Sequence, residues 1–170
     1  MDIDLDALEA RPDQSPLPDD AISALARSLL SSDITSEQQH RALLLLARRH
    51  TPDAEHALHA VLEAPADADV TVGAMRTLCL RWDLGARYSG VLRHFIRGVR
   101  WDVDAGGEVR RAAISIAGEM LATGTDTELM FDLIRVSEDG TDEPARRAAV
   151  RALAHATGYH GRPVDLRIDL

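Results

Sequence analysis

The segment Gly106–Met120, "GGEVRRAAISIAGEM", decides how this sequence folds. Its pattern is an acidic residue, paired arginines, paired alanines and an apolar run at helical spacing. The pattern returns in Thr141–Gly158, "TDEPARRAAVRALAHATG", with the paired arginines 36 residues further along. A pattern that recurs at this distance indicates a supersecondary unit that packs against its own copies.

The same period runs through most of the chain. Predicted first helices carry the apolar sets Ala26/Leu29/Leu30, Leu58/Val61/Leu62, Leu92/Phe95/Ile96 and Met130/Leu133/Ile134. Predicted second helices centre on Ala42, Ala74, Ala112 and Ala148. Successive landmarks are 32–38 residues apart. Two helices per period of this length predict an all-α fold, a right-handed α-solenoid of about four helical pairs.

Capping residues and breakers divide the chain. Residues 1–19 are predicted to be an acidic flexible or extended tail, residues 20–158 the repeat domain, and residues 159–170 an extended C-terminal segment. Helix starts are expected at residues that favour N-caps or first turns: Asp19 or Asp20, Ser36, Thr51, Thr125–Thr127 and Asp142. Gly158 is the predicted stop of the last helix.

Residues 104–120 and 139–158 resemble HEAT repeats, in particular the bilin-lyase-like class, in which an acidic turn leads into a Val-Arg start and then into packed alanines. The resemblance covers residues 20–158 and is best over residues 87–158. We expect Ala112/Ala113 and Ala148/Ala149 to allow close helix packing. We expect Arg110 and Arg146 to bind acids in the turns, with Asp104 the candidate for Arg110. HEAT-like repeats serve adaptors, lyases, hydroxylases and glycosylases, so the resemblance implies a fold and leaves the function open.

Composition narrows the chemistry. All 19 basic residues are arginine, which excludes a catalytic or phosphate-binding lysine. Cys79 is the single cysteine, the acidic N-terminus does not resemble a signal peptide, and no apolar run is long enough to span a membrane. We therefore expect a cytoplasmic protein. The net charge of −9 divides into −6 for residues 1–20 and −3 for the remainder, which makes nucleic acid an unlikely partner.

No motif predicts catalysis. His56, His59 and Glu63 share one helical face and could hold a metal, but we prefer to interpret them as a solvated helix flank, because Leu58, Val61 and Leu62 already define the buried side. The chain has no His-Glu dipeptide, which excludes a HEAT-like di-iron hydroxylase, and no Gly-x-Ser-x-Gly motif. We predict no catalytic residue, no metal and no cofactor, and hence a protein that is not an enzyme.

Arginines and tryptophans are the candidate binding residues. Ten arginines fall on predicted second helices, which line the concave side of a solenoid. Half of them could simply cover alanine-rich cores. Arg81-Trp82-Asp83 and Arg100-Trp101-Asp102 repeat the triplet "RWD", which fits either a binding hot spot or helix-end tryptophans that close the core. The predicted protein-binding residues are Arg76, Arg81, Trp82, Arg100, Trp101, Arg111, Arg147 and Arg151.

These residues predict a protein-binding adaptor or regulatory module, a class that includes bacterial immunity and accessory proteins. The alternative is a nucleic-acid-binding repair protein of the HEAT-like alkylpurine glycosylase type, in which Trp and Asp would surround a damaged nucleotide. The acidic tail is expected to lie near the second-helix arginines or to compete for them. Val164, Leu166 and Ile168 alternate with polar residues, which predicts a C-terminal strand that pairs within the chain, with another protein or with a second copy.

Overall fold

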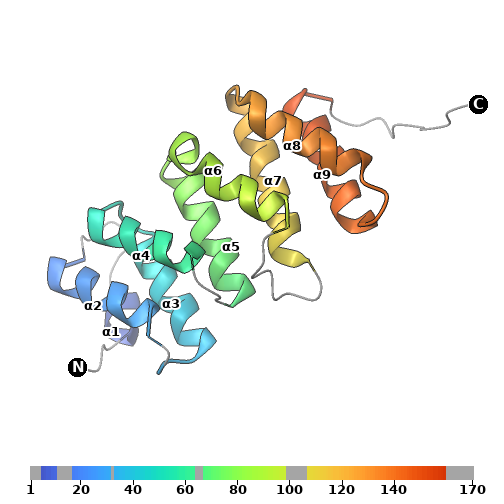
Figure 1. The fold of residues 1–170 in the computed structure, drawn as a ribbon. Helices are drawn as coiled ribbons and strands as arrows, with labels where there is room; N and C mark the ends of the chain where they lie inside the picture. The colour runs from blue at the N-terminus through green and yellow to red at the C-terminus, as the bar shows by residue number, and fades with distance from the viewer. Residues whose placement is uncertain (1–4, 11–16, 32, 64–66, 99–106, 160–170) are drawn as a thin grey trace, which may run out of the picture.

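Every regular element of the part of the chain that the structure describes is helical, which confirms the all-α prediction. The computed structural model describes residues 5–10, 17–31, 33–63, 67–98 and 107–159. The helices form an elongated array that runs from α1 near the N-terminus to α9 near the C-terminus (Figure 1).

The helices lie in two rows. The first row holds α2 (Asp19–Leu29), α4 (Pro52–Glu63), α6 (Gly85–Ile96) and α8 (Thr127–Glu138). The second row holds α3 (Ser36–Leu46), α5 (Ala68–Arg76) with the π-helix η1 (Thr77–Arg81), α7 (Glu108–Thr123) and α9 (Glu143–Ala156). Each second-row helix contacts the next one in that row, and each first-row helix contacts the second-row helix that follows it in sequence. Figure 1 shows this alternation along the array.

Most helices start at a residue whose side chain accepts a backbone hydrogen bond, as the capping pattern predicts. The Asp126 carboxylate accepts from the Leu129 amide at 2.9 Å, and the Asp142 carboxylate accepts from the Ala145 amide at 3.0 Å. The predicted cap at Ser36 is wrong by one residue, because Thr35 forms a capping box with Gln38. Neither Asp19 nor Asp20 caps α2: both lie inside its first turn, where the helix dipole favours negative charge.

The core fills the space between the rows. The predicted apolar sets of α4 and α6 are fully buried, at Leu58, Val61, Leu62, Leu92, Phe95 and Ile96. The sets of the two end helices are partly wrong, because Leu30 is 48% exposed and Ile134 is 37% exposed. Leu30 follows the last residue of α2, and α8 is the last first-row helix among the described residues, so within this part of the chain neither position is enclosed on all sides.

Small residues bring α7 and α9 into close contact, as the paired alanines predict. Ala113 and Ala149 are completely buried. At Gly118 the helices approach so closely that an added Cβ would lie 2.8 Å from Ala152 Cα. No side chain larger than hydrogen fits between the two backbones there.

Arg110 on α7 contacts residues of two other helical segments, Ile96 of α6 and Asp142 at the start of α9. Its Nε donates to the Ile96 carbonyl at 2.9 Å, and its Nη1 contacts the Asp142 carboxylate at 2.6 Å. The acid expected from the sequence was Asp104, which lies outside the described residues. Arg146 binds Glu143 within α9. Arg110 is therefore a structural residue, as the sequence predicts.

The second helix of the second pair changes its winding at its end. In η1 the Trp82 amide bonds to the Thr77 carbonyl, five residues earlier, at 2.9 Å. One turn of this helix thus holds an additional residue compared with an α-helix. Asp83 follows with φ of 55°, a left-handed conformation that is uncommon for a residue with a Cβ.

The structure describes a helix inside residues 1–19, which the sequence predicts to be a flexible or extended tail. Leu5–Glu9 form a short helix, α1, which contacts α3. The predicted C-terminal strand of Val164, Leu166 and Ile168 lies outside the described residues and stays a prediction. Gly158, the predicted stop, has the left-handed φ of 69° that suits a residue just after a helix end.

Candidate functional site

The structure brings two of the predicted arginines into one groove. Arg111 on α7 and Arg151 on α9 line the same cavity, of about 650 Å³. Arg147 lies one turn before Arg151, but its Nε contacts Glu143 at 2.6 Å in the same helix. Arg76 is exposed on α5, the neighbour of α7, and lies outside the groove. The four arginines thus occupy the neighbouring helices α5, α7 and α9 of the second row, and Arg111 and Arg151 are the two that line the groove.

We call this cavity the α7–α9 groove. Arg111, Ser115 and Glu119 follow each other at four-residue intervals along the outer side of α7. The groove has a small apolar surface, because Ala122, Ala148 and Ala152 line it together with the polar residues. Arg151 is exposed and has no ion pair within the described part of the chain. An arginine in this state can bind a carboxylate through two parallel hydrogen bonds.

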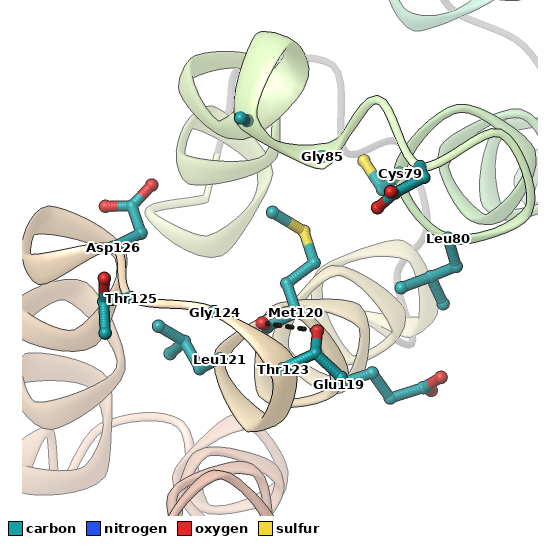
Figure 2. A pocket seen from close by; sticks show the side chains of 12 residues that line it. Cys79, Leu80, Gly85, Glu119, Met120, Leu121, Thr123, Gly124, Thr125 and Asp126 are labelled. Carbon is teal, nitrogen blue, oxygen red and sulfur yellow. Dashed lines mark hydrogen bonds between the residues drawn. The ribbon is translucent and has the colours of Figure 1, made fainter.

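A second cavity of about 750 Å³ adjoins the groove. It lies between the η1–α6 turn and the α7–α8 turn, and it shares Glu119 and Thr123 with the α7–α9 groove. Figure 2 shows Met120 pointing toward the turn that carries Gly85, where an added Cβ would lie 2.8 Å from Met120 Cε. Asp83, Glu119 and Asp126 give this cavity three carboxylates. The two neighbouring cavities therefore differ in charge.

Ser115, Glu119 and His155 belong to the groove but were not among the predicted site residues. The sequence does contain a signal for the first two. The interval of four residues from Arg111 places them on the same helical face, away from the apolar positions of α7. The same signal exists for His155, because it follows the predicted Arg151 by four residues on α9.

Trp82 is part of the packing and is not a free recognition residue. Its indole N–H donates to the Ala47 carbonyl at 3.3 Å, and its ring lies 4.9 Å from the His50 ring, centroid to centroid. This geometry agrees with the interpretation that the tryptophan closes the core at a helix end. Arg81, beside it, is exposed. Arg100 and Trp101, the other predicted pair, lie outside the described residues.

Two acidic residues that the sequence analysis did not single out are buried between first-row helices. Glu55 accepts a hydrogen bond from the Tyr88 hydroxyl at 2.7 Å and contacts His50 Nε2 at 2.7 Å. The bond from His50 is the main reason that the pKa of Glu55 is lowered, and it outweighs the effect of burial. Burial and the bond to Glu55 raise the pKa of Tyr88 to about 12.

Asp132 on α8 is the second buried acid. Arg93 Nε donates to it at 2.8 Å, and Arg97 Nε donates to its other oxygen at 3.0 Å. Burial alone would raise the pKa of Asp132, but the two arginine hydrogen bonds outweigh burial and lower it. Arg93 on α6 and Arg97, which directly follows this helix, are therefore committed to internal contacts.

The side chains of Cys79 and His59 also take part in packing. Burial raises the pKa of the Cys79 thiol to about 12, so it is protonated at neutral pH and a poor nucleophile. His59 Nε2 lies 3.5 Å from Glu63, and its ring packs 5.5 Å from the Tyr88 ring, centroid to centroid. Within the described ranges, no three His, Cys, Asp or Glu side chains are grouped so that they could hold a metal ion.

Comparison of the chain with protein-family models, with curated proteins and with solved structures finds no match. Among the described residues, no helix combines the length and the apolar character needed to cross a membrane.

Proposed function

We propose that this chain is a non-catalytic protein-binding module, an adaptor or regulatory partner that contacts another protein through the second row of helices. The observation that carries the proposal is the α7–α9 groove, where Arg111 and Arg151 line a cavity of about 650 Å³ with a small apolar surface. Arginine beside buried apolar area is the combination enriched at binding hot spots.

The proposal includes the architecture that presents this surface. We take the two rows of helices to be a right-handed α-solenoid of about four HEAT-like pairs, with the second row on the concave side. The contacts between neighbouring helices of the second row support this interpretation, as does the repeated arginine-alanine pattern of α7 and α9. A concave surface built from repeated units suits extended contact with a protein partner.

The distribution of the other charged groups supports a binding role. Glu55, Asp132 and Arg110 are occupied by contacts that hold helices together. The described residues favour the adaptor over the repair-enzyme alternative, because Trp82 is engaged in packing and no Phe, Tyr or Trp side chain lines the groove for a base to stack on.

Affinity capture tests the proposal. The tagged full-length chain and the variant R111S/R151S would be incubated with lysate of the source cells, and bound proteins quantified by mass spectrometry. We expect the variant to retain at most about one-tenth of a specifically bound partner, because two charge-assisted contacts are lost. R27S/R135S is the matched control, since Arg27 and Arg135 are exposed on α2 and α8 of the first row.

Equal capture by all three proteins would contradict the proposal. Circular dichroism and thermal unfolding must first show that the variants are folded. Both controls are required because Arg111 is partly buried, so that a general loss of structure would imitate a loss of binding.

A further inference from the structure

The N-terminal helix α1 shows what kind of segment a second-row helix accepts. Arg41 on α3 binds Glu9 through two hydrogen bonds, from Nε at 2.7 Å and from Nη2 at 2.9 Å, and it also binds Asp6. Leu5 and Leu8 pack against the core beside these contacts. The segment is therefore acidic on one side and apolar on the other, with its two carboxylates less than one turn apart.

The contact of α1 with α3 confirms part of one sequence-based expectation. The acidic tail does reach a second-row arginine, at Arg41. The hydrogen bonds from Arg41 lower the pKa of Glu9, so this carboxylate is ionised in the contact. Within the described residues the contact is made at the α3 end of the array, and no residue of α1 lines the α7–α9 groove.

The α7–α9 groove has the same chemical elements as the surface that α1 occupies. Arg111 and Arg151 provide two guanidinium groups where α3 provides Arg41. Ala122 is exposed and lines the groove beside the buried Ala148 and Ala152, so it gives a leucine side chain an apolar contact. Both surfaces belong to the second row, on α3 in one case and on α7 and α9 in the other.

From this correspondence we propose that the groove binds a short acidic amphipathic helix of a partner protein. Two carboxylates on one face of that helix bind Arg111 and Arg151, and its apolar side chains cover the alanines. This inference rests on the proposed protein-binding function and names the chemistry of the partner. A helix in a groove with anchors at three- and four-residue intervals is an established mode of peptide recognition.

The surrounding charges restrict where the acids of the partner can lie. Glu119 lies at four-residue spacing beyond Ser115, and Asp83 and Asp126 line the adjoining cavity. Carboxylates of the partner placed there would be repelled. The bound segment is therefore acidic toward Arg111 and neutral or basic toward the second cavity.

The peptide MDIDLDALEA, the sequence of residues 1–10, is a probe with the required chemistry. It would be added to the ¹⁵N-labelled full-length chain, in which α1 already occupies α3, and amide shifts followed by NMR. We expect concentration-dependent shifts at Arg111, Ser115 and Arg151. The control peptide, with asparagine and glutamine in place of its acids, should bind at least about tenfold more weakly, since it lacks the charge.

Substitutions in the chain complete the test. R111S/R151S should weaken binding of the acidic peptide about tenfold or more, and R27S/R135S should leave it unchanged. Shifts confined to α3, equal binding of both peptides, or full binding to R111S/R151S would each overturn the inference. If a captured partner depends on Arg111 and Arg151 but the peptide does not bind the groove, this inference fails and the proposed function stands. If the peptide binds but no captured protein depends on these arginines, the proposed function fails.

Discussion

The junction between α4 and α6 and the junction between α6 and α8 each bury one carboxylate, but they stabilise it differently. Glu55 is held mainly by the neutral hydroxyl of Tyr88 and by His50, with the exposed Arg87 at one oxygen. Asp132 is held by two arginines, Arg93 and Arg97. Both junctions of the first row thus bury one acid, but the residues that bind this acid differ between them.

The difference in partners predicts a difference in the cost of removing the acid. Substitution of Asp132 by Ala leaves Arg93 half-buried without its main partner, and breaking a buried ion pair in this way costs about 3 kcal/mol. Urea unfolding at pH 7, followed by circular dichroism, measures this free energy. E128A is the matched control, because Glu128 is 69% exposed and contacts the same arginine, so its loss should cost less than about 1 kcal/mol. Equal costs for the two variants would contradict the interpretation.

Substitution of Glu55 by Gln should have a smaller effect. The amide oxygen of glutamine can still accept the hydrogen bond from Tyr88, so the losses are the charge and its ionic contacts with His50 and the exposed Arg87. We expect a loss of about 1 kcal/mol in the same urea experiment. D53N, at an exposed position of the same helix, is the control. A loss as large as that of D132A would show that the two junctions do not differ in the way described.

The smallest effect is expected in the pH dependence of stability. The pKa values of Glu55 and Asp132 are lowered in the folded chain, from ordinary values of 4.5 and 3.8. Both carboxylates therefore contribute stability above their ordinary pKa values, and this contribution is lost as the pH falls through the lowered values. The difference in unfolding free energy between wild type and D132A should shrink from pH 6 to pH 3. A constant difference over this range would show that the charge of Asp132 is not responsible.

The spacing of apolar residues and the capping residues were sufficient to predict the helices of the two rows and most of their starts. The spacing of Leu58, Val61 and Leu62 identifies a buried face without knowledge of the neighbours, because the period of 3.6 residues is a property of one helix. The exposure of Ile134 could not be predicted in this way, since it depends on whether another helix follows α8 in the row.

The candidate site was predictable only in part. Arg111 and Arg151 could be placed on second helices from their positions beside the paired alanines. That Asp142 binds Arg110, and that Asp132 binds Arg93 and Arg97, follows from contacts between residues more than 30 positions apart. Such pairings are set by the packing of whole helices, which the sequence pattern of one unit does not contain.

The π-helix η1 has a consequence for how this chain can vary in length. In a π-helical turn the hydrogen bond joins residues five apart, so the turn holds one residue more than an α-helical turn. The helices before and after this turn can therefore keep their contacts with neighbouring helices. An in-frame codon gained or lost at such a turn changes the length of a unit without displacing the helices that follow.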